Sequence, residues 1–224
     1  MVWTDGSDKA FKLTPRVNHT LTAVPPKRGG GEPSDMPTAG RLYLFGGDDG
    51  HTTRNDLWVY DVERQEWDEP ELRGRRPSAR SRHTATFVRW FRDDTQVDED
   101  RIYVYGGVGA STEVVHYVDI ARRTWVEPRT VGERPLPLLG HTAVHLNGSL
   151  WVFGGRDARR NYNGLWRLDT ISHEWLRPAP TGMLPPPASK HVIRRRSARS
   201  ASRQPASPSS SGARATPTGA RGVA

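Results

Sequence analysis

The chain has no cysteine and no long hydrophobic run. Without cysteine it cannot form a disulfide bond or a thiolate metal site, and cysteine usage gives no clue to its compartment. The N-terminal residues lack an apolar run of signal-peptide length, and no later stretch approaches the ~20 apolar residues of a membrane span. We therefore expect a soluble protein of the cytoplasm or nucleus that does not bind membranes.

Acidic residues are absent from the segment 188–224, which contains eight Lys and Arg residues. Subtracting these eight from the 33 Lys and Arg of the chain leaves 25, which equals the 25 Asp and Glu, so the rest is neutral. The basic balance is therefore no sign of nucleic-acid binding by a folded domain. Rich in Ser, Arg, Pro and Ala, residues 192–224 are predicted to form a disordered tail.

Helical periodicity is also absent, and a repeated pattern stands in its place. A strand ends in a glycine pair, after which an Asp precedes a Trp by six residues, the Trp precedes a Pro by ten, and the Pro precedes a His by six. The period of about 50 residues indicates propeller blades. The three copies contain Gly46, Gly47, Asp61, Trp67, Pro77 and His83; Gly106, Gly107, Asp119, Trp125, Pro135 and His141; and Gly154, Gly155, Asp169, Trp175, Pro185 and His191.

Each copy predicts a blade of four strands, here called a to d, and an all-β fold. The blades span approximately 19–67, 83–125 and 141–175, within a repeat region of residues 1–191. The third copy joins strands a and b by the two-residue turn Asn147-Gly148, which favours a tight hairpin. The first two copies carry insertions at this tip, and we expect exposed loops there, the second of them at 89–100.

The repeated residues are predicted to be structural. The glycine pairs permit positive φ and close backbone approach where strand b ends. The Trp gives strand d an apolar surface for an adjacent blade, and its indole N–H can reach a loop carbonyl. The Asp suits the c to d turn by bonding to backbone N–H groups, and the Pro fixes the crossover to the next blade.

The combination of FGG, LWVYD, a Trp and a P-x-x-R-x-x-H-T segment resembles kelch repeats over about residues 15–191. The resemblance implies a β-propeller, typically of five to seven blades, that acts as a protein-interaction module. Trp3-Thr4 with the segment 16–19 is also similar to the start of some kelch proteins that serve as substrate receptors of cullin ubiquitin ligases. The sequence departs from the family pattern at Leu138 and Ala188, where an Arg is expected.

About three blades are fewer than the four to eight of closed propellers, so the ring is predicted to be incomplete. After His191 the expected strand is replaced by the basic tail. A natural tail and a chain cut short with an out-of-frame end both fit. The break falls just inside a strand, which favours truncation.

No catalytic, metal or cofactor site is predicted. The histidines that begin strand a are expected to be structural, since no second ligand joins them at metal-binding spacing. The acidic runs at 48–51 and 93–100 lack the ligand spacing of a calcium loop and are interpreted as solvated loops. Motifs for nucleophilic, phosphoryl-transfer and metalloprotease chemistry are missing, so we expect neither an enzyme nor a small-molecule substrate.

The loops between strands b and c and the crossovers from d to a are predicted to share one face of the propeller. That face is rich in arginine, and the hypothesis is that an acidic protein partner docks on it. A simpler interpretation is that these arginines only keep the loops solvated. An adaptor is the first function predicted, and a cullin-ligase receptor or a tail-driven binder of nucleic acid or membrane surfaces is the alternative. The candidate binding residues are Arg54, Arg80, Arg156, Arg159, Arg160 and Tyr162.

Overall fold

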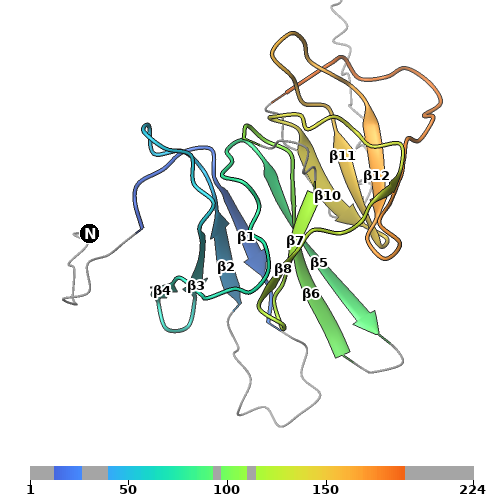
Figure 1. The fold of residues 1–224 in the computed structure, drawn as a ribbon. Coiled ribbons are helices and arrows are strands. Elements are labelled where there is room, and N and C mark those ends of the chain that lie inside the picture. The colour runs from blue at the N-terminus through green and yellow to red at the C-terminus, as the bar shows by residue number, and fades with distance from the viewer. Residues whose placement is uncertain (1–12, 27–39, 93–96, 110–114, 190–224) are drawn as a thin grey trace, which may run out of the picture. The chain divides into compact units, whose positions relative to one another are not determined.

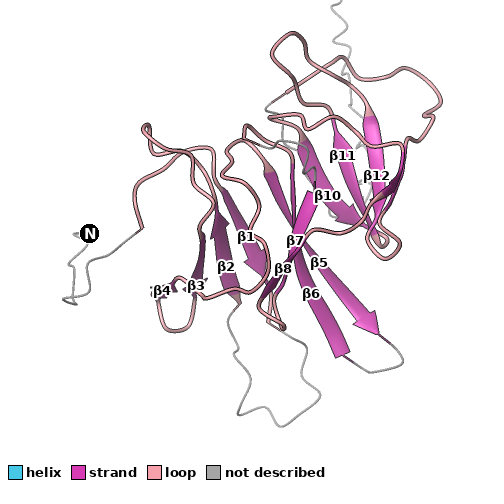
Figure 2. Cartoon of the chain, viewed as in Figure 1, coloured by secondary structure: helices cyan, strands magenta, loops and turns pink. Residues whose placement is uncertain are grey.

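The computed structural model describes residues 13–26, 40–92, 97–109 and 115–189. Within these ranges every regular element is a β-strand (Figure 2). None of them therefore contains a helix long and apolar enough to cross a membrane. The predicted tail at 192–224 lies outside the described residues, and so do Asp93 and Asp94 of the predicted acidic loop.

The strands form three antiparallel sheets in chain order, one for each sequence repeat (Figure 1). The prediction of an all-β fold with three four-stranded blades is therefore confirmed. Blade 1 contains β1 (Thr20–Val24), β2 (Arg41–Phe45), β3 (Leu57–Asp61) and β4 (Glu66–Asp68). Blade 2 contains β5 (Thr84–Arg92), β6 (Val97–Tyr105), β7 (Val115–Asp119) and β8 (Thr124–Val126). Blade 3 contains β10 (Thr142–Leu146), β11 (Ser149–Phe153), β12 (Leu165–Asp169) and β13 (Glu174–Leu176), with β9 (Val131–Gly132) added in parallel beside β13.

The c to d turns form as their sequence predicts. The Oδ1 atom of Asp61 accepts hydrogen bonds from the backbone N–H groups of Glu63 and Arg64, both at 3.1 Å. Asp169 does the same in blade 3, at 2.9 and 3.0 Å. These bonds hold the pKa of both carboxyl groups below the usual value of 3.8. A charged Asp at the end of strand c therefore closes this turn in blades 1 and 3.

The hydrophobic core lies between blades, because successive residues of a strand point to opposite faces of its sheet. In β6, Ile102 and Val104 pack toward Phe45 of blade 1, whereas Tyr103 and Tyr105 pack toward Leu150 of blade 3. All four β6 residues are at most 2 % exposed. A central blade therefore buries both faces, and each core cluster depends on two neighbouring repeats.

The described part of the insertion at 89–100, residues 89–92 and 97–100, is paired strand rather than the loop that the sequence predicts. The β5–β6 pairing continues to Arg92 and Val97, and it places Arg89 opposite Asp100. The Arg89 guanidinium forms an ion pair with Asp100 at 2.7 Å and also donates to the carbonyl groups of Pro25 and Pro26, at 2.8 and 3.0 Å. Asp100 is therefore a buried partner of Arg89, and the hairpin connects blade 2 to the a to b segment of blade 1.

Candidate functional site: the face of the b to c loops

The b to c loops and the last part of each crossover lie on the same face, as predicted. Backbone bridges join Val17 to Asp48 in blade 1, Ser81 to Val108 in blade 2 and Leu139 to Arg156 in blade 3. Each bridge pairs the residues just before strand a with the loop that follows strand b of the same blade. We call this surface the loop face, and it consists of the described residues in 14–19, 46–56, 77–83, 106–109, 135–141, 154–164 and 185–189.

The first part of each crossover lies elsewhere, which corrects the prediction that whole crossovers emerge on this face. Arg73 pairs in parallel with Thr124 of β8, and β9 pairs in parallel with β13. The chain leaving one blade thus runs along the outermost strand of the next blade before it turns inward. Arg73 and the residues of β9 belong to the outer edge of the sheets rather than to the loop face.

The glycine pairs join each blade to the start of the next. The first glycine has a φ of 62° to 68° and the second a φ of 93° to 98°, values that L side chains rarely adopt. In the first pair, a Cβ on Gly46 would lie 2.6 Å from the carbonyl oxygen of Arg80. The second glycine donates its N–H to the following repeat in all three blades, at 2.9 to 3.0 Å. The six residues are Gly46, Gly47, Gly106, Gly107, Gly154 and Gly155.

The Trp of strand d packs on the blade before it. The Trp125 ring lies 5.1 Å from the ring of Phe45, and that of Trp175 lies 5.6 Å from Tyr105. Their indole N–H groups are buried without a hydrogen-bond partner among the described residues, so the predicted bond to a loop carbonyl does not form. Trp67 contacts Tyr60 of its own sheet at 5.1 Å and is only half-buried.

Around the start of strand a, the three blades are connected by a repeated set of polar contacts. Arg82 donates its backbone N–H to the carbonyl of Asn18 at 2.9 Å, and Gly140 donates to that of Arg82 at 3.0 Å. The Nε2 atom of His83 lies 3.0 Å from the hydroxyl of Thr20 in the preceding blade. Burial, assisted by Arg80, lowers the pKa of His83 to about 3, so its ring is neutral and structural.

Arg80 is placed away from solvent, although the sequence suggests it as a binding residue. It is 0 % exposed, and its guanidinium donates to the carbonyl oxygens of Ser78 and Gly106, at 3.0 and 3.3 Å. These contacts fix the crossover against the glycine pair of blade 2. A partner on the loop face cannot reach this side chain, so Arg80 belongs to the scaffold.

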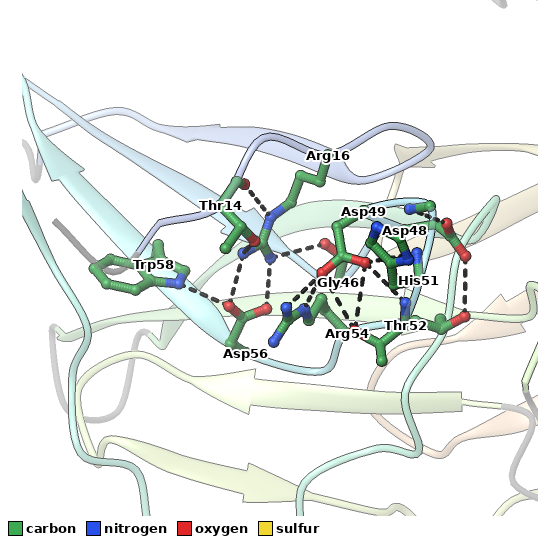
Figure 3. A network of polar contacts seen from close by, with 12 residues as sticks. Thr14, Arg16, Gly46, Asp48, Asp49, His51, Thr52, Arg54, Asp56 and Trp58 are labelled. Atoms are coloured by element: carbon green, nitrogen blue, oxygen red, sulfur yellow. Dashed lines mark hydrogen bonds and ion pairs between the residues drawn. The ribbon is translucent and has the colours of Figure 1, made fainter.

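The equivalent arginine of blade 1, Arg16, lies in a network that Figure 3 shows from close by. Its guanidinium binds Asp56 through both oxygens, at 2.6 and 2.9 Å, and the carbonyl of Gly46 at 3.1 Å. The Trp58 indole donates to the same carboxylate at 2.8 Å. Burial acts to raise the pKa of Asp56, but these hydrogen bonds outweigh it and leave the pKa below 3.8.

Arg54, a second predicted binding residue, is neutralised by its neighbour. The Nε and Nη2 atoms of its guanidinium both donate to one oxygen of Asp49, and the Nε contact measures 2.9 Å (Figure 3). A backbone N–H bond from Thr52 and the bond from Arg54 lower the pKa of Asp49 well below 3.8. Arg54 can therefore contribute little free positive charge to the loop face.

The b to c loop of blade 3 brings the remaining candidates together around Asp157. This carboxylate accepts the Tyr162 hydroxyl at 2.6 Å and the backbone N–H groups of Arg160 and Arg159 at 2.8 and 2.7 Å. These bonds lower the pKa of Asp157 to about 2. The guanidinium of Arg160 lies over the Tyr162 ring, 4.9 Å from its centroid. Asp157 thus stabilises the loop by hydrogen bonds inside it, two of them to backbone N–H groups.

Arg156 projects from the same loop and is exposed. Within the described ranges its guanidinium forms no ion pair or side-chain hydrogen bond, and the same is true of Arg159. Arg156 lines a cavity of about 270 Å³ together with Arg82, which also forms no such pair there. The cavity opens among the starts of strand a, and its other lining residues are Asn18, His19, His83, Leu139, Gly140, His141 and Ser189.

Arg82 is the residue that sequence reasoning undervalued. It directly precedes the strand-a histidine, as Asn18 and Gly140 do in the other blades. That spacing places the same position of every repeat around one opening, and it would have identified Arg82. By contrast, Trp3 and Thr4, on which the similarity to cullin-ligase receptors depends, lie outside the described residues.

The part of the chain that the structure describes contains no cluster of metal-ligating side chains. No group of three or more His, Cys, Asp or Glu side chains there could hold a metal ion. What the geometry offers instead is a cavity with two arginines and a polar rim. Such a site can bind carboxylate groups through charge-assisted hydrogen bonds.

Comparison with known proteins identifies a family to which this chain is similar. A family model described as the KLHDC2/KLHL20/DRC7 Kelch-repeats domain matches residues 36–197. The bovine Rab9 effector protein with kelch motifs is 30 % identical over 158 residues, or 68 % of this chain. Human host cell factor 2 is 27 % identical over 197 residues (75 % of this chain), and acyl-CoA-binding domain-containing protein 4 of Arabidopsis thaliana is 31 % identical over 150 residues (62 %).

These matches cover only 37 %, 22 % and 21 % of the three relatives' own lengths. The three relatives have different names, and that of the bovine protein mentions kelch motifs. The matched segment includes the three glycine pairs and the three strand-d Trp residues described above. The chain therefore belongs to the family of the KLHDC2/KLHL20/DRC7 Kelch-repeats domain, a family of kelch-repeat proteins.

Proposed function

We propose that this chain is a protein-interaction module or adaptor that binds an acidic segment of a partner protein on its loop face. The proposal includes no catalysis, no small-molecule substrate and no nucleic acid, and it places the protein in the cytoplasm or nucleus. The observation that carries it is the cavity lined by Arg82 and Arg156, whose charges are not neutralised by the described residues.

Charge balance on the loop face supports an acidic ligand. The carboxylates of the described loops are engaged by the protein itself. Asp56 and Asp49 bind Arg16 and Arg54, Asp157 accepts the Tyr162 hydroxyl, and Asp48 accepts the Gly50 N–H and the Thr53 hydroxyl. Arg82, Arg156 and Arg159 are left to act on a ligand. A carboxylate that enters the cavity would gain charge-assisted bonds from arginine and would lose no competing internal partner.

The relatives are consistent with an interaction role. One of them is named as a Rab9 effector with kelch motifs, and the name describes an action on another protein. Their names differ, and repeat scaffolds carry different binding surfaces on one architecture. The partner of this chain is therefore argued from the arginines of its own loop face.

The test measures binding of Asp- and Glu-rich peptides to the full chain. The double variant Arg82→Glu/Arg156→Glu is expected to weaken binding at least about tenfold, because it reverses both charges at the cavity. The control is Arg64→Glu/Arg129→Glu, which changes the net charge equally at exposed positions outside the loop face. Equal binding by the two double variants would contradict the proposal, as would binding of nucleic acid in place of peptide.

A further inference from the structure

Two variable positions of the repeat supply the arginines of the cavity. The glycine pairs and the strand-d Trp are the same in all three blades, whereas these two positions differ from blade to blade. The residues directly before the strand-a histidine are Asn18, Arg82 and Gly140, and those directly after the glycine pair are Asp48, Val108 and Arg156. The blade itself therefore requires an arginine at neither position.

Hydrogen bonds between neighbouring backbones hold Arg82 and Arg156 close to one segment of the chain. Gly140 donates its N–H to the carbonyl of Arg82 at 3.0 Å. The residue before it, Leu139, exchanges two backbone bonds with Arg156, at 3.0 and 3.1 Å. Both arginines are thus fixed by consecutive residues of one crossover, and both line the same cavity.

The backbone of Arg82 lies in the left-handed region, with a φ of 58°. Asn18 and Gly140 have φ values of 57° and 65° at the equivalent positions. Glycine adopts this region without steric cost and Asn visits it readily, whereas Arg has no such advantage. Residues held in this conformation cost stability and are typical of ligand-binding sites. Arg82 is therefore better suited to binding than to folding.

The cavity has positive charge and no carboxylate. Its lining residues include Arg82 and Arg156 but no Asp or Glu. His83 adds no charge, because burial, assisted by Arg80, lowers its pKa to about 3. A single carboxylate would balance only one of the two arginines. A phosphate monoester carries about −1.5 to −2 at pH 7 and has three strong acceptor oxygens, so one such group balances both.

We propose that this cavity binds a phosphorylated serine or threonine of the partner segment, with Arg82 and Arg156 both donating to the phosphate. The inference rests on the proposed function, because it specifies which acidic group the loop face receives. Guanidinium groups bind phosphate through paired N–H···O bonds. Asn18 and Ser189 line the same cavity and can donate to a remaining oxygen through an amide and a hydroxyl.

The size and number of charges favour a single phosphoryl group on a protein. The cavity volume of about 270 Å³ is several times the roughly 30 Å³ that one water molecule occupies in the liquid, so a tetrahedral phosphoryl group has room. A nucleic acid instead presents diesters with one charge each, and its binding uses many cations along the strand. Clustered arginines that meet one phosphorylated side chain are a general mode of peptide recognition.

The experiment measures binding of three degenerate peptide libraries to the full chain. Both ends of every peptide are blocked, and the fixed central residue is phosphoserine, glutamate or serine. The phosphoserine library is expected to bind at least about tenfold more tightly than the glutamate library, which should bind more tightly than the serine library.

The outcomes separate this inference from the proposed function. Equal binding of the phosphoserine and glutamate libraries, both above that of serine, would overturn the phosphate assignment and leave the proposed function standing. Binding of neither acidic library would contradict both. Vesicles that contain a phosphatidylinositol phosphate, or single-stranded DNA, are tested in parallel. If either binds as tightly as the phosphoserine library, a phosphorylated protein segment is the wrong ligand.

Single variants test the two arginines. Arg82→Asn and Arg156→Gln should each weaken binding of the phosphoserine library by about tenfold or more, because each leaves one phosphate charge unbalanced. The matched control is Arg159→Gln, which removes the same charge from an exposed residue of the same loop that does not line the cavity. Its binding should be unchanged. Equal losses in all three variants would show a general charge effect and overturn the assignment.

A stability measurement separates a binding role of Arg82 from a structural one. Arg82→Asn should raise the midpoint of thermal unfolding by about 2 °C while it weakens binding, because Asn adopts the left-handed backbone more readily. The control is Arg123→Asn, at a φ of 51° in the c to d turn of blade 2. It should raise the midpoint similarly and leave binding unchanged. A lower midpoint for Arg82→Asn would assign Arg82 to the fold and overturn its role in phosphate binding.

Discussion

Blades 2 and 3 carry the same repeat but differ in how it is buried. In blade 2 all five residues of β7 are buried, because blade 1 covers one face of the sheet and blade 3 covers the other. In blade 3 four of the five residues of β12 are only partly buried. The comparison shows that a residue's contribution depends on the neighbouring blade as much as on its own strand, as in other repeat proteins.

The largest expected effect is a difference among the three strand-d tryptophans. Trp125→Ala and Trp175→Ala should each lower the free energy of unfolding by about 4 kcal/mol, since each removes a buried ring from a core cluster. Trp67→Ala should lower it by less than about 2 kcal/mol, because its ring is only half-buried and belongs to neither core cluster. Urea unfolding at low protein concentration measures all three. Equal losses would contradict dependence on the neighbouring blade.

A smaller difference in the free energy of unfolding is expected when Ala replaces either of two glycines with positive φ. A Cβ on Gly106 would lie 2.5 Å from the carbonyl oxygen of Leu138, in the junction of blades 2 and 3. Gly106→Ala should therefore lower the free energy of unfolding by about 3 kcal/mol, from backbone strain and displacement together. Gly50→Ala meets no described atom within 4 Å and should lower it by about 1 kcal/mol, from strain alone. Thermal unfolding of both variants separates the two contributions.

The junction of blades 1 and 2 should also respond to pH through His83. Its pKa is about 3 in the folded chain, mainly because of burial, and 6.5 without that burial. Below pH 6.5 the unfolded chain binds the additional proton, so this part of the stability is lost as the pH falls from 6.5 toward 3. When the pH falls from 6.5 to 5, the free energy of unfolding of His83→Gln should therefore decrease by about 2 kcal/mol less than that of the unaltered chain.

Urea unfolding at several pH values measures this difference in slope. The control is His51→Gln, which changes an exposed histidine on the loop face. Its stability should follow that of the unaltered chain across the same pH range. Parallel curves for His83→Gln and the unaltered chain would show that His83 does not link folding of this junction to protonation.

The sequence predicts the blades well because their signals are local and repeated. The Asp at the end of strand c bonds to backbone groups two and three residues later, so a short pattern is sufficient. The β5–β6 extension is not predicted, because a local window gives Arg89 and Asp100 the polar composition of a loop. Their burial depends on each other and on the carbonyl groups of Pro25 and Pro26, more than 60 residues away in the chain.

Which of the candidate binding arginines are exposed could not be predicted, for a similar reason. Arg80 lies just before strand a of blade 2, and Arg156 directly follows the glycine pair of blade 3. Both lie in polar segments, so composition cannot tell which of the two is buried. The carbonyl of Gly106 holds Arg80 inside the fold, whereas Arg156 extends from the loop of blade 3. Only contacts between distant segments separate the scaffold arginine from the one that can meet a partner.

The most direct measurement compares binding and stability in Arg82→Glu/Arg156→Glu. If these arginines serve the loop face alone, the free energy of unfolding should change by less than about 1 kcal/mol, because neither guanidinium bonds to the described residues of the fold. Acidic peptides should bind at least about tenfold more weakly. Unchanged peptide binding in a fully folded variant would contradict the assignment of the loop face as the interaction surface.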